Sequence, residues 1–142
     1  LPPAMVERLA DQALDLGPKA VGIKVGERGF LLAINVDLSD DDLSLAKRIA
    51  REIRTRREAG EEGFAGVRAL AFPLPSRGIV QVSMNLTDPD RSCPDEMVRF
   101  VEERAGISGT ELIGVIRERD LPGATRLPID SRQIWSADYF GR

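Results

Sequence analysis

The sequence contains no histidine, and only one cysteine, one tryptophan and one tyrosine among its 142 residues. Without histidine, the chain lacks the commonest general base near neutral pH and the commonest transition-metal ligand. Any proton transfer that the chain performs alone therefore depends on Asp, Glu, Lys, Arg, Tyr139 or Cys93. A single cysteine excludes an internal disulfide framework and fits a reducing compartment, so we expect a cytoplasmic protein.

Strong net charge and long apolar runs are also missing. The formal net charge is −3, which gives no general case for binding to nucleic acid or to a membrane. No apolar run reaches the length of a membrane-spanning helix, and the opening LPPAMVERL lacks the basic and apolar regions of a signal peptide. The hydrophobic content of 42% and the charged content of 30% fit one globular domain. Because the chain starts with Leu1 rather than Met, it stays open whether it is a portion of a longer protein.

Apolar periodicity predicts a core of four strands and two helices. The expected strands span residues 30–38, 67–72, 79–86 and 110–116. The first helix is expected over residues 40–57 with Ser39 as its N-cap, and the second from residues 92–96 to Gly106.

Further segments flank this core. We expect a helical lead-in over residues 1–19, an extra strand over residues 20–25, and a tail over residues 121–142. In the tail, Trp135, Tyr139 and Phe140 are expected to make packing or dimer contacts rather than to take part in chemistry.

The element order predicts an α+β fold over residues 20–120. A βαββαβ core forms a ferredoxin-like sandwich, with two helices on one face of a mixed, mostly antiparallel sheet and the extra N-terminal strand added to it. In that topology the strands 30–38 and 79–86 are central neighbours. Strict alternation then assigns one set of small and polar residues to the face turned away from the helices. That set is Ala33, Asn35, Asp37, Gln81, Ser83 and Asn85.

Two interpretations of this polar face stay open on the pattern alone. Antiparallel sheets commonly have one solvated face. Solvated strands usually carry Lys, Glu and Thr, however, whereas carboxamides and small residues leave room and offer both donors and acceptors. Such a face suits a flat polar heterocycle or a second domain. It does not suit RNA, because an RNA-recognition motif needs aromatic residues where this chain has Ala33, Asn35, Gln81 and Ser83.

Other charged or reactive residues give weaker signals. Lys24 and Arg28 flank the turn before the first core strand, where a cation is suited to hold a carboxylate, although an ordinary surface turn is the slightly better explanation. Cys93 lies at a predicted helix start with no base nearby and is interpreted as incidental. No metal site is expected, because helix capping explains the acidic residues better than a calcium loop does. The basic side of the first helix is expected to be a solvated face: Lys47, Arg48, Arg51, Arg54, Arg56 and Arg57.

Three segments together resemble the formiminotransferase domain family, and specifically its C-terminal subdomain, over roughly residues 17–120. They are VGERGFLLAINVDL (25–38), GIVQVSMNLTD (78–88) and GTELIGVI (109–116). The resemblance implies an enzyme of histidine breakdown that moves a formimino group from N-formiminoglutamate to its co-substrate tetrahydrofolate. It also implies two α/β subdomains that face each other with folate between them.

This resemblance implies roles for the polar face. Asn35, Gln81, Ser83 and Asn85 are expected to line the folate cleft or to contact an N-terminal formiminotransferase subdomain, in the same chain or a separate one. By chemical inference, Lys24 and Arg28 would contact the glutamyl carboxylates.

The family's catalytic histidine belongs to the N-terminal subdomain, and this chain has no histidine. We therefore assign no catalytic residue and expect no transfer by this chain alone. The alternative is a non-catalytic domain that uses the open sheet face to bind a ligand or to form a homodimer.

Overall fold

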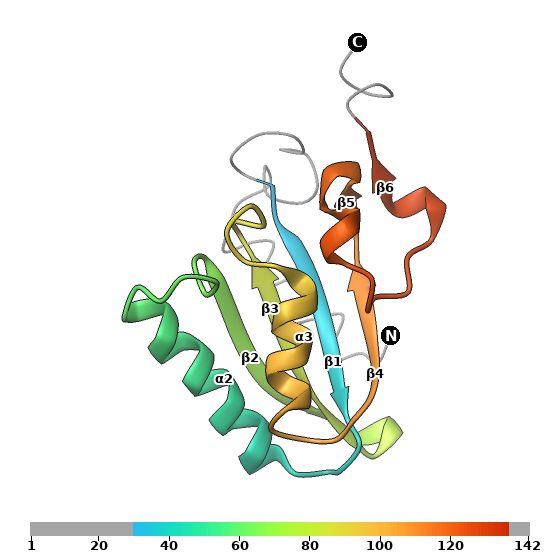
Figure 1. The fold of residues 1–142 in the computed structure, drawn as a ribbon. Coiled ribbons are helices and arrows are strands. Elements are labelled where there is room, and N and C mark those ends of the chain that lie inside the picture. The colour runs from blue at the N-terminus through green and yellow to red at the C-terminus, as the bar shows by residue number, and fades with distance from the viewer. Residues whose placement is uncertain (1–29, 137–142) are drawn as a thin grey trace.

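A computed structural model of the chain describes residues 30–136. Within that range the core elements follow in the order strand, helix, strand, strand, helix, strand (Figure 1). They are β1 (Leu32–Leu38), α2 (Leu43–Glu58), β2 (Val67–Leu74), β3 (Ile79–Leu86), α3 (Pro94–Glu102) and β4 (Ile107–Ile113). The predicted lead-in, the predicted strand over 20–25, Lys24, Arg28, Tyr139 and Phe140 lie outside the described residues.

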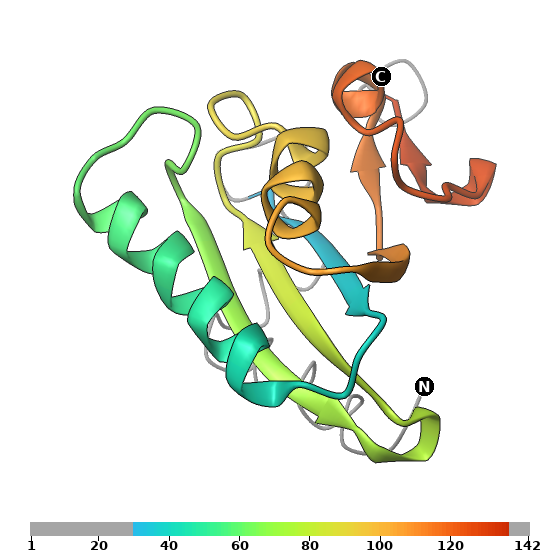
Figure 2. The ribbon, with the colours of Figure 1, turned by 60° about the horizontal axis from the view of Figure 1, so that its bottom comes forward.

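The four strands form one sheet in the order β2-β3-β1-β4, and all three pairings are antiparallel. This is the order of a ferredoxin-like sandwich, and both helices cover the same face of the sheet (Figures 1 and 2). The predicted α+β fold class is therefore confirmed, with β1 and β3 as the central pair.

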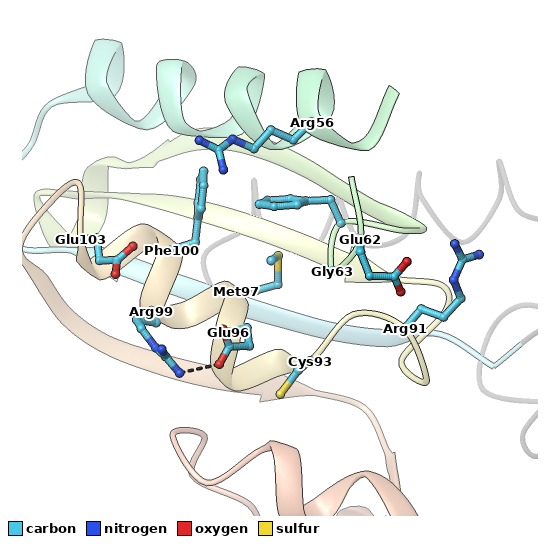
Figure 3. A pocket seen from close by; sticks show the side chains of 11 residues that line it. Arg56, Glu62, Gly63, Arg91, Cys93, Glu96, Met97, Arg99, Phe100 and Glu103 are labelled. Atoms are coloured by element: carbon cyan, nitrogen blue, oxygen red, sulfur yellow. Dashed lines mark hydrogen bonds and ion pairs between the residues drawn. The ribbon is translucent and has the colours of Figure 1, made fainter. Parts of the chain in front are cut away.

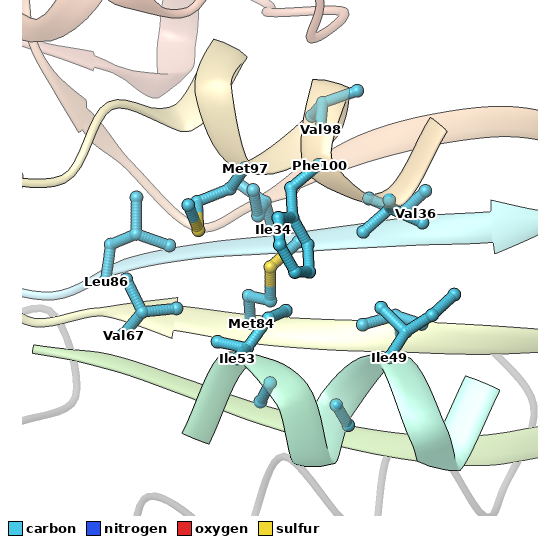
Figure 4. Packing of buried hydrophobic residues seen from close by; sticks show 14 of the residues in the cluster. Ile34, Val36, Ile49, Ile53, Val67, Met84, Leu86, Met97, Val98 and Phe100 are labelled. Atoms are coloured by element: carbon cyan, nitrogen blue, oxygen red, sulfur yellow. The ribbon is translucent and has the colours of Figure 1, made fainter. Parts of the chain in front are cut away.

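The hydrophobic core lies between the sheet and the two helices (Figure 4). Alternate residues of the central strands point into it, as Ile34, Val36 and Met84 do, and each is fully buried. From the helices, Ile53 of α2 and Val98 of α3 are equally buried and close the layer. Alternation in the strands and the 3.6-residue period of the helices thus meet in a single apolar layer.

Capping residues mark the starts of the two helices. The N-cap of α2 is Asp42, whose carboxylate accepts a hydrogen bond from the Leu45 backbone N–H at 3.0 Å. The prediction of Ser39 was wrong because three further residues precede the first helical turn. For α3 the predicted position is right: Cys93 is the N-cap and Pro94 is the first helical residue.

The last strand begins earlier than its apolar pattern indicates. β4 starts at Ile107 rather than Thr110, because its pairing with β1 shifts register between Asp37 and Leu38. A bulge of this kind interrupts the alternation on which the prediction depended. Ile116, the predicted end of this strand, instead begins a separate short strand, β5 (Ile116–Arg117). This strand pairs in parallel with β6 (Ile134–Trp135). Three short 3-10 helices complete the described elements: Pro75–Arg77, Glu118–Gly123 and Ser131–Gln133.

Side chains cap both edges of the sheet. On β2, Arg54 and Arg57 of α2 donate hydrogen bonds to the backbone carbonyls of Ala69 and Val67, at 3.0 and 2.9 Å. On the opposite edge, Gln133 donates to the Leu112 carbonyl of β4 at 3.1 Å. Part of the basic side of α2 therefore protects an edge strand rather than facing water, which corrects the sequence interpretation.

Candidate functional site

The face of the sheet turned away from the helices carries the polar residues that alternation assigns to it. Opposed residues in an antiparallel pair share a face, and three cross-strand rows follow from the register. The rows are Arg68, Asn85, Ala33 and Ile113; Leu70, Ser83, Asn35 and Glu111; and Phe72, Gln81, Asp37 and Gly109. Of the six predicted site residues, Asn35, Gln81, Ser83 and Asn85 therefore come together on one surface, which we call the polar face.

Burial distinguishes between the two interpretations of this face. Asn35 is 1% exposed, Gln81 0% and Ser83 8%. A merely solvated sheet face would leave these side chains in contact with water. The centre of the polar face is instead buried, whereas Asn85 and Glu111 at its margins are half-buried. Buried polar groups are costly unless they are hydrogen-bonded.

A continuous chain of hydrogen bonds crosses the polar face. Arg77 donates to Asp37 Oδ2 at 3.0 Å, and Gln81 Nε2 donates to Asp37 Oδ1 at 2.7 Å. The same nitrogen donates to Glu111 Oε1 at 3.2 Å, and that oxygen also accepts from Asn35 Nδ2 at 3.0 Å. Donors and carboxylates alternate along the chain, so each carboxylate is held by at least one carboxamide.

Gln81 Oε1 is the exception to this pairing. It is buried and has no hydrogen-bond partner, and among the described residues no other buried side-chain nitrogen or oxygen is left in that state. Its orientation is fixed, because exchanging Oε1 and Nε2 would place an oxygen against two carboxylates. An unsatisfied buried carbonyl of this kind costs about 1–3 kcal/mol.

Sequence reasoning missed Glu111 and Arg77 as members of this site. The alternation of β4 shows that Thr110 and Glu111 lie on opposite faces, but only the register places Glu111 beside Asn35. Arg77 lies in the turn between β2 and β3, where no periodicity applies. Asp37 was assigned to the face by alternation but was not proposed as a site residue.

A second concavity lies on the helix side, between α3 and the loop after α2 (Figure 3). It encloses about 390 Å³ and is walled by the edge-to-face pair of Phe64 and Phe100. Its three cations are already paired: Arg56 binds Glu52 at 2.9 Å, Arg91 binds Asp88 at 3.7 Å, and Arg99 binds Glu96. The charge is balanced, so this cleft has no evident preference for an anionic ligand.

Cys93 also lines this cleft, and its thiol donates to the Gly123 carbonyl at 3.3 Å. That contact ties the start of α3 to the C-terminal segment.

A third cavity, of about 470 Å³, opens beside the end of β3. Arg117 lies in its wall with its guanidinium 4.9 Å from the centroid of the Phe30 ring. Its charge is satisfied by a two-point pair with Asp120, at 2.7 and 3.1 Å, and by Asp90 at 3.4 Å. The pKa of Asp90 is lowered, mainly by a hydrogen bond from Arg119. This cluster ties the segment after β4 to the loop between β3 and α3.

Across residues 30–136, no three His, Cys, Asp or Glu side chains gather in a way that could hold a metal ion. Neither α2 nor α3, nor any shorter helix in that range, is long and apolar enough to cross a bilayer.

A family model covers the polar face. The family model described as "Formiminotransferase domain" matches residues 33–135, a range that contains every described polar-face residue and continues into the C-terminal segment.

The named relatives that match the chain carry formimidoyltransferase or formiminotransferase names. A glutamate formimidoyltransferase of Thermoplasma acidophilum is 36% identical over 75% of this chain, and one of Streptococcus pyogenes serotype M1 is 33% identical over 69%. A formiminotransferase cyclodeaminase-like protein of Arabidopsis thaliana is 31% identical over 70%. The matches cover 37%, 33% and 33% of these relatives, so the chain spans about a third of their length.

Proposed function

Because the chain belongs to the formiminotransferase domain family, we propose that it forms the folate-cleft part of a glutamate formiminotransferase. The complete enzyme would transfer a formimino group from N-formiminoglutamate to tetrahydrofolate and release glutamate. In this proposal the polar face contacts the folate co-substrate, and a partner subdomain closes the cleft. The assembly would act in histidine breakdown in the cytoplasm.

The observation that carries this proposal is the buried polar face. Small and carboxamide residues line it, and the one unpartnered buried side-chain atom of the described range, Gln81 Oε1, belongs to it. A face built only for a hydrophobic partner would not bury Asn35, Asp37 and Gln81 together. A polar heterocycle supplies the donors and acceptors that such a surface needs.

The composition of the chain supports a separation of folate binding, in this chain, from proton transfer, in the N-terminal subdomain. Moving the amidine carbon to an amine of the folate requires proton transfer, and the chain has no histidine to perform it near neutral pH. The chain also spans only about a third of its named relatives. We therefore assign the catalytic histidine to an N-terminal formiminotransferase subdomain outside this sequence, and we expect the chain to be inactive in transfer alone.

A transfer assay tests this proposal directly. The 142-residue chain, a purified histidine-bearing N-terminal formiminotransferase subdomain, and a mixture of the two would each receive N-formiminoglutamate and tetrahydrofolate. Formation of formiminotetrahydrofolate is expected only in the mixture. Activity of the chain alone would contradict the division of labour, and no activity in a mixture that forms a complex would contradict the proposed function.

One observation favours a second candidate, a non-catalytic dimerisation domain. Leu70, on β2 in the same row as Ser83 and Asn35, is 38% exposed, and no other large apolar side chain of the described range is as exposed. Protein interfaces combine apolar residues at their centre with a polar rim. Light scattering on the chain and on Leu70→Ser distinguishes the candidates, because only a dimer built on this face would dissociate in the variant.

A further inference from the structure

We propose that the outward side of α2, together with the edge of β2 beside it, is a docking surface for a short acidic peptide segment of a partner protein. We call it the basic surface, and its residues are Lys47, Arg48, Arg51, Arg54 and Arg57. Figures 1 and 2 show α2 running along β2 at the outer margin of the helix layer. Because the polar face lies on the other side of the sheet, this inference goes beyond the proposed function and does not depend on it.

The basic surface concentrates the positive charge that has no carboxylate partner. Among residues 30–136, every arginine outside α2 except Arg68 forms an ion pair with a carboxylate. On α2, ion pairs within the same range leave out Lys47, Arg48 and Arg51, and all three side chains are exposed. The whole chain has a net charge of −3, so this positive charge is a local feature and not a general excess.

Arg54 and Arg57 extend this surface to the edge of the sheet. Their guanidinium groups donate hydrogen bonds to the backbone carbonyls of Ala69 and Val67, at 3.0 and 2.9 Å. A carbonyl oxygen satisfies a donor but does not neutralise a positive charge. The nearest carboxylate to either group is that of Glu58, 3.6 Å from Arg57 and with a 73% exposed side chain. Both guanidinium groups are therefore held in place with N–H donors left to bind a carboxylate.

The stability of the helix itself does not account for this arrangement. Arg51 is three residues from Arg48 and from Arg54, and four residues from Lys47. Like charges at these spacings are neighbours on the helix surface, where they repel each other and destabilise the helix. The helix dipole favours cations in the last turn, such as Arg57, but gives no reason for Lys47 and Arg48 in the first half. A bound acidic segment would relieve the repulsion.

Acidic residues at both ends of α2 limit the kind of anion that fits. Exposed aspartates occupy residues 40–42 before the helix, and exposed Glu58, Glu61 and Glu62 follow the cations. The cationic stretch 47–57 covers about 15 Å along the helix axis, a length that roughly five residues of an extended peptide would match. A bilayer or a nucleic acid duplex would bring its phosphates over both acidic ends as well. The charge pattern therefore favours a short acidic peptide.

Fluorescence anisotropy on the 142-residue chain provides the test. The probe is a fluorescein-labelled pentapeptide of alternating glutamate and aspartate, and its control is the same peptide with glutamine and asparagine. At low ionic strength we expect saturable binding of the acidic probe and no binding of the neutral peptide. If the acidic probe does not bind at protein concentrations up to about 1 mM, the proposal is wrong.

Removing the exposed cations of the basic surface should weaken this binding. In the triple variant Lys47→Gln, Arg48→Gln, Arg51→Gln, we expect the affinity for the acidic probe to fall at least about tenfold, because three charge pairs are lost. Glutamine is a good helix former, so α2 should persist, and far-ultraviolet circular dichroism checks that it does.

A second triple variant is the matched control for net charge. Arg91→Gln, Arg99→Gln, Arg132→Gln removes the same charge from side chains that are 58%, 54% and 89% exposed and already have carboxylate partners. Its affinity for the acidic probe should change by less than about threefold, because salt screens these distant charges. Equal losses of affinity in the two triple variants would overturn the assignment of the basic surface.

The other classes of anion are tested with a short DNA duplex and with vesicles of equal parts phosphatidylserine and phosphatidylcholine. Tighter binding of either one than of the acidic probe would refute the assigned partner class. Charge reversal gives an independent check: Lys47→Glu, Arg48→Glu, Arg51→Glu should lose the acidic probe and bind labelled pentalysine more tightly than the wild type does. A folded protein that does not exchange its preference in this way would contradict the proposal.

Discussion

Removing the carboxylate of Asp37 should destabilise the fold far more than removing its cationic partner. In Asp37→Ala, the buried Gln81 N–H loses its 2.7 Å charge-assisted acceptor, and a group that is 0% exposed is left unsatisfied. Hydrogen bonds to charged groups contribute about 1.5–3 kcal/mol, so we expect a loss of about 3 kcal/mol in the free energy of unfolding. Arg77→Ala should cost at most about 1 kcal/mol, because its side chain is half exposed and the ion pair is screened by water.

The assay is equilibrium unfolding in urea, followed by far-ultraviolet circular dichroism, on the wild type and both variants. A loss of about 3 kcal/mol is a large fraction of the roughly 5–15 kcal/mol that stabilises a typical domain. Equal, small effects of Asp37→Ala and Arg77→Ala would refute the reasoning. Such a result would mean that the polar face is hydrated in solution and that the hydrogen-bond chain across it does not hold.

Three further outcomes follow from contacts elsewhere in the fold. Asp120→Ala leaves the buried Arg117 guanidinium without its two-point partner, so thermal unfolding should report a loss of about 3 kcal/mol. Asp42→Ala removes the N-cap of α2 and should cost about 1 kcal/mol in urea unfolding, with Asp42→Ser restoring most of it. The pKa of Glu52 is lowered from its ordinary 4.5, mainly by a hydrogen bond from Arg104, so the pair stabilises the fold above that value and loses its effect as pH falls through the lowered pKa. Glu52→Gln should therefore be up to about 1 kcal/mol less stable than wild type at pH 7. This difference in the free energy of unfolding should disappear at acid pH, and urea unfolding at several pH values measures it.

The fold was largely predictable because local periodicity and topology agree. The strand over residues 79–86 was predicted to its observed bounds, since Gly78 and strict alternation mark its start and its faces. The start of α2 was missed because Ser39 and Asp42 are both good capping residues, and only the path of the chain after β1 selects between them. The start of β4 was missed because the register shift opposite Asp37 and Leu38 has no local sequence signal.

The candidate site was predictable only in part, for a related reason. Alternation and strand order were enough to place Asn35, Gln81, Ser83 and Asn85 on one surface. They were not enough to find Glu111, whose position depends on a pairing between strands far apart in the sequence. They also could not show that this surface is buried, because burial depends on what covers a strand and not on its own pattern.

The most direct test of the central claim is calorimetric titration with the tetrahydrofolate analogue 5-formyltetrahydrofolate. The wild-type chain and Asn85→Leu would be compared, after urea unfolding has shown that both are folded. Leucine keeps the side-chain size but removes the carboxamide from the polar face, so we expect measurable binding by the wild type and an affinity at least about tenfold lower in the variant. Equal affinity of the two proteins would contradict the assignment of the polar face as the floor of the folate cleft.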